Sequence, residues 1–296
     1  MNLIVECLKS ILYGIVEGIT EWLPVSSTGH LILIEDWLPF AFSTDHEFLN
    51  EFSEMFQVVI QLGAILAVVI LFFGKLWPFG KAKSQAEKRN TWSLWLKVVV
   101  ASVPAALIGV VGDKILEKLS GRDLDGWLYN SVVVAAMLIV YGVAFILVER
   151  MRRDRMPRVD CVEEISYRTA LLIGCFQVLS IVPGTSRSGS TILGAMLLGL
   201  SRTAGAEFSF FMAIPAMVGA SGIKLLGFGS WVAESGAAVP TEAWVVLAVG
   251  FAVSFLVSLA AIRFLMDFVK KHSFAPFGVY RIALGVLVLL LWALVG

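Results

Sequence analysis

Long runs of apolar residues recur along the chain and leave little room for charge. A helix that crosses the roughly 30 Å hydrocarbon core of a bilayer needs about 20 such residues. Six segments meet this requirement, and each is predicted to be a transmembrane helix: Phe52–Phe73, Leu94–Val111, Leu128–Val148, Ala204–Leu225, Trp244–Leu265 and Pro276–Leu294. The pattern therefore predicts an all-α polytopic membrane protein.

Two further apolar stretches are interrupted by proline, glycine and hydroxyl residues. The interruptions are Pro24–Gly29 (PVSSTG) and Pro183–Gly189 (PGTSRSG). Non-helical backbone is tolerated at membrane depth only where it is buried in protein or lines a wet cavity. We therefore predict two re-entrant helical hairpins, each made of a helix, a break and a second short helix. The alternative is eight plain spans, in which both stretches cross the membrane fully.

The two interruptions superimpose at an offset of 160 residues, which places Ser26 on Ser186 and indicates an internal duplication. We predict a single membrane domain, 1–296, that contains one repeat at about 1–150 and another at about 165–296. Each repeat would hold one hairpin and three spans. Because three is an odd number of crossings, the repeats should have inverted topology.

Basic residues are concentrated in the loops on one side of this topology. Segment 75–89 carries five Lys or Arg, segment 150–168 carries six, and Arg202 with segment 263–271 adds four. Positively charged loops favour the cytoplasmic side. The loop that joins the repeats should therefore be cytoplasmic, and both termini should face outward.

Composition supports a membrane location, since 58% of the residues are hydrophobic and only 16% are charged. That is too little charge for the surface of a typical soluble domain, so membrane lipids are the expected surroundings. The net charge of zero argues against a nucleic-acid partner. The apolar stretch at the N-terminus contains several charged residues, so we expect it to belong to the fold and not to a removable signal peptide. The sequence leaves open whether the chain forms a homodimer.

Two glutamates stand four residues apart just before the first interruption. Glu17 and Glu21 would project from one face of a helix toward the break. Ionisable residues inside a membrane are costly and usually face a cavity, an ion or one another. Both are candidate catalytic residues and candidate ligands of a divalent cation, Mg²⁺ or Ca²⁺. The alternative is a pair of carboxylates that reaches water near the interface.

The first interruption continues into hydroxyl residues and a histidine. Ser26 or Ser27 is a natural N-cap for the helix that follows. The spacing of Ser27 and His30 suits a hydroxyl nucleophile beside an imidazole base, or an imidazole nucleophile beside a serine. Plain helix capping is the alternative. Ser27 and His30 are candidate catalytic residues, and Ser26 and Thr28 are candidate substrate-binding residues.

The second interruption supplies a planar cation, several hydroxyl groups and the free N–H groups of a helix start. Arg187 can hold phosphate oxygens through two parallel hydrogen bonds, and the helix start adds a positive dipole end. Arg187 is a candidate catalytic residue, and it can also pair with Glu17 or Glu21 while the site is empty. The candidate substrate-binding residues here are Ser186, Ser188, Gly189 and Thr191. Arg281 begins the last span and is interpreted as an interfacial anchor.

Two functions of different classes fit these features. One is an enzyme that hydrolyses a lipid-linked diphosphate, and the other is a transporter or flippase of a lipid phosphate or another anion, because secondary transporters are also built from inverted repeats with broken helices. A carrier has no need of a nucleophile beside a base. Ser27 and His30 therefore favour the enzyme.

The motifs GIVEGITEWLPVSSTGH (Gly14–His30) and PGTSRSGSTI (Pro183–Ile192) resemble those of the undecaprenyl-diphosphate phosphatases of the bacitracin-resistance type. The similarity continues through FQVVIQLGAILAV (Phe56–Val68). It implies hydrolysis of undecaprenyl diphosphate at the periplasmic side of the bacterial inner membrane, with the help of a divalent cation. The products would be undecaprenyl phosphate and inorganic phosphate. This reaction would recycle the lipid carrier for cell-wall synthesis and confer bacitracin resistance.

The resemblance also implies roles for single residues. Glu17 and Glu21 match the acidic motif of the family, and Ser27 and His30 match its serine–histidine element. Its second, phosphate-binding motif is matched by Ser186, Arg187 and Thr191. The chain departs from many relatives at Gln57, where they carry glutamate, which weakens the case for an essential acid at that position.

Overall fold

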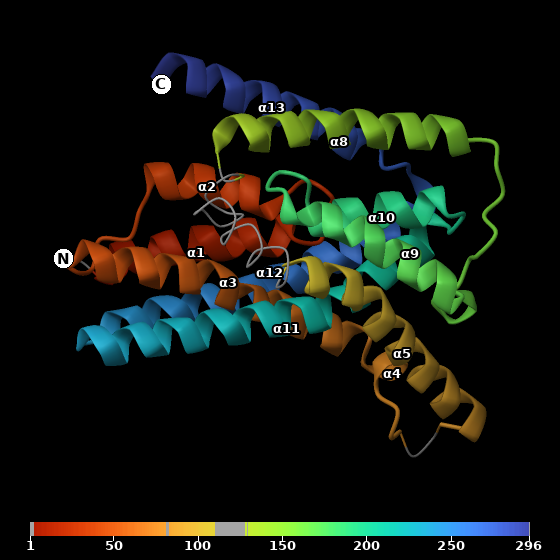
Figure 1. Cartoon of the computed structure of the whole chain (residues 1–296), viewed down its shortest axis with the longest axis horizontal. Coiled ribbons are helices and arrows are strands. Elements are labelled where there is room, and N and C mark those ends of the chain that lie inside the picture. Colours follow the sequence, from red (N-terminus) through yellow and green to blue (C-terminus); the bar gives the residue numbers. More distant parts are fainter. Residues whose placement is uncertain (1–2, 81–82, 110–127, 129, 296) are drawn as a thin grey trace. The chain divides into compact units, whose positions relative to one another are not determined.

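The computed structural model describes residues 3–80, 83–109, 128 and 130–295 (Figure 1). In this part of the chain the regular elements are helices, and five of them are long and apolar enough to cross a membrane. These are α3 (His46–Leu71), α8 (Ser131–Arg152), α11 (Arg202–Ser235), α12 (Thr241–Lys271) and α13 (Ala275–Val295). The protein is therefore a helical, multi-pass membrane protein.

The predicted span at Leu94–Val111 is not among these five helices. Helix α5 (Gln85–Leu107) covers most of it but begins with the polar sequence QAEKRNT, and residues 110 and 111 lie outside the described part. Within α5, the Lys97 ammonium is buried and donates to the carbonyl of Glu163 at 2.7 Å. Five of the six predicted spans thus match apolar helices of sufficient length, and the sixth stays a prediction.

The chain divides into two compact units, each assembled from separate stretches of sequence. The first unit comprises Met1–Trp22, His30–Phe72 and Ala213–Arg263, and the second comprises Leu23–Gly29, Phe73–Met212 and Phe264–Gly296. Both units therefore combine residues from both halves of the sequence.

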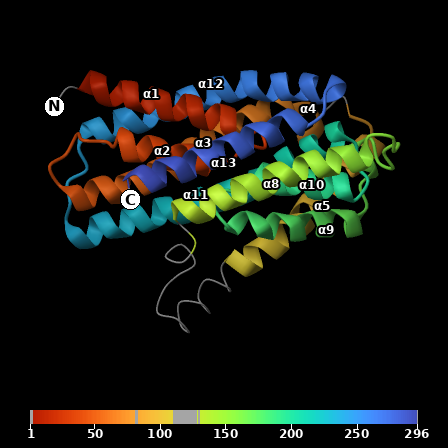
Figure 2. The same cartoon turned by 90° about the horizontal axis from the view of Figure 1, so that it is seen from above.

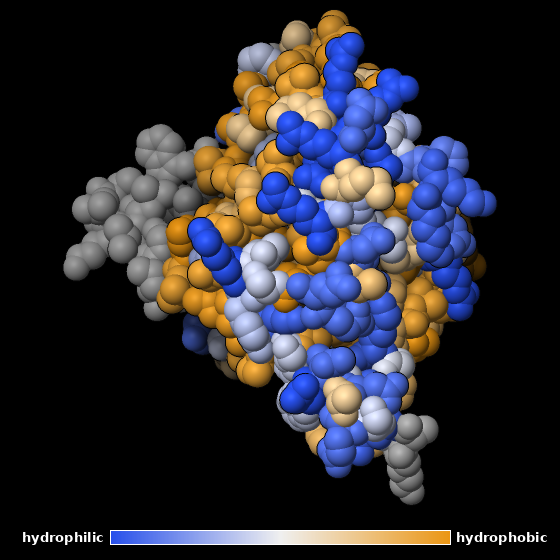
Figure 3. Space-filling view, turned by 90° about the vertical axis from the view of Figure 1, so that its right-hand side faces the viewer, coloured by the Kyte–Doolittle hydropathy of each residue, from blue (hydrophilic) through white to orange (hydrophobic). Residues whose placement is uncertain are grey.

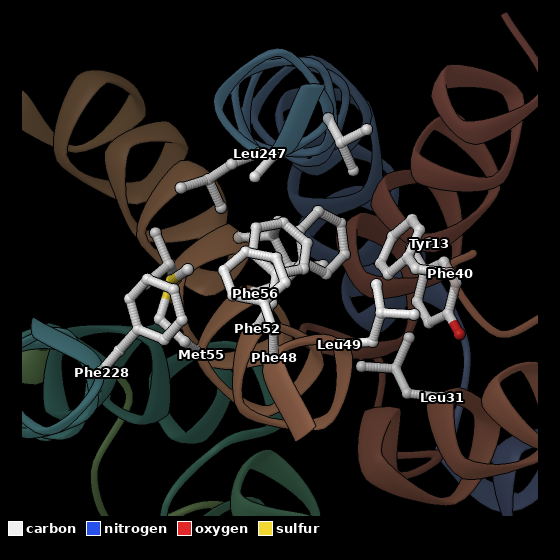
Figure 4. Close-up of a cluster of buried hydrophobic side chains, with 14 residues drawn as sticks. Tyr13, Leu31, Phe40, Phe48, Leu49, Phe52, Met55, Phe56, Phe228 and Leu247 are labelled. Atoms are coloured by element: carbon white, nitrogen blue, oxygen red, sulfur yellow. The ribbon is translucent and has the colours of Figure 1, made fainter. Parts of the chain in front are cut away.

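An aromatic cluster fills the interior of the first unit (Figure 4). Tyr13 stacks on Phe40 with ring centroids 5.2 Å apart, and Phe40 meets Phe56 edge-on at 4.9 Å. Phe48, Phe52 and Phe56 recur every fourth residue, so one face of α3 carries all three rings into the cluster. Their burial fixes α3 against the neighbouring elements α1 (Leu3–Thr20) and α2 (Ser27–Trp37).

Helix α1 packs closely along α12 in this unit, as Figure 2 shows. A Cβ atom added at Gly14 would lie 2.7 Å from the carbonyl oxygen of Gly250, and one added at Gly18 would lie 2.8 Å from that of Ser254. The glycines thus allow the two backbones to approach, as small residues do between membrane helices. The Ser258 hydroxyl donates to the carbonyl of Gly18 at 3.3 Å. This packing holds the segment of α1 that carries Glu17.

The second unit is built around two pairs of helices. Helices α8 and α13 lie side by side (Figure 1), and a Cβ atom added at Gly142 or at Gly278 would lie 2.6 Å from the carbonyl of the other. The second pair consists of α9 (Tyr167–Val178) and α10 (Arg187–Leu197). At the end of α8, the buried Glu149 accepts two hydrogen bonds from Arg202, at 2.9 and 2.6 Å, and one from the Phe274 N–H at 2.7 Å.

Candidate active site

Both interrupted stretches have the predicted order of helix, break and short helix. Helix α1 ends at Thr20 and α2 begins at Ser27, which leaves the first break at residues 21–26. The second break, residues 182–186, lies between a 3₁₀ turn (Leu179–Ile181) and α10.

The two breaks share an unusual backbone feature. In the described chain, Ser26 (φ 75°) and Ser186 (φ 71°) are the non-glycine residues with positive φ, a conformation that costs about 1–3 kcal/mol. In each break the serine hydroxyl oxygen then accepts the N–H of the third following residue, at 3.3 Å from Gly29 and 3.1 Å from Gly189. Each serine thus caps a short helix, and the remaining N–H groups of the first turn point toward the break. The offset of 160 residues seen in the sequence extends to backbone geometry.

Arg281 joins the two breaks inside the second unit. Its guanidinium donates to the carbonyl of Pro24 at 2.9 Å, in the first break, and to those of Gly184 and Thr185 at 2.6 and 2.9 Å, in the second. The guanidinium also lies 5.3 Å above the ring of Tyr141, within cation–π range. These contacts satisfy carbonyl groups that the interrupted helices leave without helical partners.

The interpretation of Arg281 as an interfacial anchor is wrong, because its side chain is fully buried. An anchor would reach the headgroup region, whereas this side chain turns inward to the breaks. A second contact links the same segments, since the Ser188 hydroxyl donates to the carbonyl of Leu23 at 3.4 Å. The breaks therefore meet within one unit.

Arg187 and Thr191 on α10 are held by Ser209 of α11. Arg187 is half-buried, and its Nη1 donates to the carbonyl of Ser209 at 2.9 Å. The Thr191 hydroxyl lies 2.6 Å from the Ser209 hydroxyl and bonds back to the carbonyl of Arg187 at 2.9 Å. Ser209 on α11 thus fixes both residues, and sequence reasoning missed it because its partners lie on another helix.

Glu17 and Glu21 belong to the first unit and are both buried. Glu17 lies on α1, and the Glu21 N–H donates to the carbonyl of Glu17 at 3.0 Å. The helical hydrogen-bond pattern therefore continues one residue past the end of α1, and residues four apart in such a pattern lie on one face of the helix.

Ser27, Thr28 and His30 occupy the first turn of α2. Ser27 is buried, and Thr28 and His30 are half-buried. Ser26 is the cap of this helix, and Ser27 is one turn from His30 along it.

The predicted divalent cation would have Glu17 and Glu21 as its protein ligands, and both are buried. Among the described residues, no cluster of three or more His, Cys, Asp or Glu side chains is positioned to hold an ion. Mg²⁺, however, commonly binds through one or two carboxylates together with substrate phosphates and water. The buried pair Glu17 and Glu21 supplies that number of carboxylates.

Elsewhere in the first unit, Gln57 donates to the carboxylate of Glu35 at 2.7 Å.

The second unit contains one group of predicted site residues, from the two breaks and the first turns of the short helices that follow them: Ser26, Ser27, Thr28, Ser186, Arg187, Ser188, Gly189 and Thr191. Glu17, Glu21 and His30 belong to the first unit. The structure adds two residues to this second-unit group that the sequence did not predict there, Arg281 and Ser209.

Comparison with known proteins gives one consistent result. Residues 10–287 match the family model described as "Bacitracin resistance protein BacA". A protein of Enterococcus faecalis named undecaprenyl-diphosphatase is 51% identical over 292 residues, which cover 98% of each chain. Proteins of the same name from Acetivibrio thermocellus and, as undecaprenyl-diphosphatase 1, from Clostridioides difficile are 50% and 48% identical. These two alignments cover 96% and 97% of this chain, and 97% and 96% of the relatives.

Proposed function

Because the chain belongs to the bacitracin resistance protein BacA family, we propose that it hydrolyses undecaprenyl diphosphate to undecaprenyl phosphate and inorganic phosphate. It is then a hydrolase of a phosphoric anhydride that recycles a carrier lipid for cell-wall synthesis. Loss of the diphosphate form would account for bacitracin resistance. The observation that carries the proposal is the junction of two polar breaks through Arg281 and Ser188, beside the start of α10.

In this proposal the start of α10 holds the terminal phosphate. The guanidinium of Arg187 donates to two phosphate oxygens, and the free N–H groups at the beginning of the helix add further donors. The Ser209 carbonyl and the hydroxyl of Thr191 support Arg187 and the first turn of α10. A site arranged in this way also stabilises the charge that develops on phosphate oxygens in the transition state.

The attacking group is Ser27, His30 or a water molecule, and each choice is compatible with the same binding mode. Attack on the terminal phosphorus breaks the bond to the bridging oxygen and releases undecaprenyl phosphate. If Ser27 or His30 attacks, water then hydrolyses the phosphorylated side chain. His30 and one of the glutamates transfer the protons.

A divalent cation, Mg²⁺ or Ca²⁺, would be held by Glu17 and Glu21. It would neutralise part of the diphosphate charge when bound. Two carboxylates placed inside a membrane carry a charge that is costly to leave uncompensated, which is the physical reason for expecting a cation there.

The membrane arrangement that suits this reaction places both interrupted stretches as re-entrant hairpins in two inverted repeats, with the site open to the periplasm. The basic loops at 75–89 and 150–168 support a cytoplasmic location for the other end of the protein. The polyprenyl chain would stay in the bilayer and enter the site sideways between helices. A homodimer is compatible with this arrangement.

The test is phosphate release from undecaprenyl diphosphate by purified protein in detergent, with Mg²⁺, with Ca²⁺ and with chelator. Arg187→Ala should lower the rate at least about 100-fold, since it removes a donor to the transition state. Arg168→Ala is the matched control, because Arg168 is exposed at the start of α9. The proposal fails if well-folded protein releases no phosphate with either metal but moves polyprenyl phosphate across vesicle membranes.

A further inference from the structure

A pocket of about 250 Å³ lies in the second unit where α8 ends and α11 begins. Five of its lining residues are cationic: Arg152, Arg153, Arg155, Arg202 and Lys270. Asp160 is an acidic residue of the same lining. We call this site the basic pocket.

The positive charge of the basic pocket is only partly balanced by protein groups. Arg202 pairs with Glu149 at 2.6 Å, and Lys270 pairs with Asp267 at 2.9 Å. Within the described ranges, no ion pair involves Arg152, Arg153 or Arg155. The five cationic side chains of the lining thus outnumber its one acidic residue, Asp160, and the excess positive charge attracts an anion.

The basic pocket lies where two helices that can span a membrane end, so we expect it near the membrane surface. Arg152 is the last residue of α8 and Lys270 the second-last of α12, and both helices are apolar enough to span. Figure 3 shows hydrophilic side chains gathered at the end of the molecule where α8 ends, with hydrophobic surface beside them. Met151 and Met156, which flank the arginines along the chain, expose 61% and 88% of their surface. Lipid would cover such exposed methionines.

We propose that the basic pocket binds the phosphate group of an anionic membrane lipid. Arginine donates to phosphate oxygens in a planar fork, and basic pockets at the ends of membrane helices attract anionic headgroups. A volume of about 250 Å³ is below the roughly 300–1,000 Å³ of pockets for drug-sized ligands. It therefore accommodates a headgroup and leaves the acyl chains outside, against Met151 and Met156.

This site is separate from the proposed phosphate-binding end of α10. Arg187 begins that helix, and Met196, near its other end, lines the basic pocket. Nine residues at about 1.5 Å each place roughly 14 Å between them along the helix axis. Lipid binding at the basic pocket can therefore be tested independently of hydrolysis.

The experiment measures binding of dihexanoyl phosphatidic acid, dihexanoyl phosphatidylcholine and inorganic phosphate to the full chain in detergent, by thermophoresis. The test variant is Arg153→Gln/Arg155→Gln. Its matched control, Lys88→Gln/Arg89→Gln, removes the same charge from α5, outside the pocket. Size-exclusion profiles check that the variants fold.

The phosphatidic acid should bind more tightly than phosphatidylcholine, and the test variant should weaken its binding at least about fivefold. The control variant and Arg187→Ala should each stay within about twofold of the wild type. Equal weakening by the test and control variants would overturn the proposal, as would weakening by Arg187→Ala alone. Inorganic phosphate that binds as tightly as the lipid would overturn the lipid as ligand in favour of free phosphate.

Discussion

Replacing Arg281 by methionine should destabilise the protein more than replacing any exposed arginine. The change removes three hydrogen bonds to the carbonyls of Pro24, Gly184 and Thr185 and leaves those oxygens buried. A hydrogen bond to a charged group is worth about 1.5–3 kcal/mol, but the values of neighbouring bonds do not simply add. Because methionine restores part of the packing, we expect a loss of about 3–5 kcal/mol in the free energy of unfolding.

Denaturant unfolding in detergent measures this loss, and phosphate release measures its functional consequence. Arg281→Met should lower kcat/KM because both breaks lose their common support. Arg281→Lys should show a smaller loss, since an ammonium keeps the charge but not the planar fork. Arg263→Met, at an exposed position of α12, is the control. A methionine variant within about 1 kcal/mol of the wild type, with unchanged kcat/KM, would refute the assigned role of Arg281.

Three further changes test neighbouring features. Gly189→Ala would place a Cβ 3.2 Å from the Arg281 guanidinium and should lower kcat/KM about tenfold, whereas Gly219→Ala, with nothing within 4 Å, should not. Thr191→Val removes a hydroxyl that lies 2.6 Å from that of Ser209, and it should lower the free energy of unfolding by about 1–2 kcal/mol. Thermal unfolding measures this loss, and an unchanged unfolding temperature would contradict it. Ser84 is the N-cap of α5, and hydrogen bonds from its backbone and side chain hold the pKa of Glu87 below its usual range. The stability that this carboxylate adds is therefore present at neutral pH and lost as the pH falls through the lowered pKa. The wild type should unfold at a higher temperature than Glu87→Gln at neutral pH, and a difference that persists in strong acid would disagree.

The membrane helices could be predicted from the sequence because runs of about 20 apolar residues are long enough to cross the hydrocarbon core and are typical of transmembrane helices. Their ends could not be predicted as well. Helix α3 begins at His46 and not at the predicted Phe52, because Asp45 accepts the N–H of Phe48 at 3.0 Å and starts the helix among acidic residues. Helix α11 likewise extends beyond the predicted Leu225 to Ser235. Hydropathy detects the apolar middle of a helix and is insensitive to its polar turns.

The candidate site, too, could be predicted from the sequence only in part. The offset between the interruptions predicts equivalent serines, and the structure shows that Ser26, and not Ser27, caps the first short helix. The direction of the Arg281 side chain could not be predicted, because hydropathy is the same whether an arginine reaches the interface or turns inward. That direction depends on carbonyls of Pro24 and Gly184 that are far away in the sequence and that only the fold brings to it.

In the proposed mechanism, the short helices that follow the two breaks act on one phosphate group. The decisive test is a double-mutant cycle on kcat/KM for undecaprenyl diphosphate, with Ser27→Ala at the start of α2 and Arg187→Lys at the start of α10. Residues that act together on one transition state have effects that do not multiply. The relative kcat/KM of the double variant should exceed the product of the relative kcat/KM values of the two single variants by at least about tenfold. Agreement with that product within about twofold would show that the two residues act independently and would contradict the proposed mechanism.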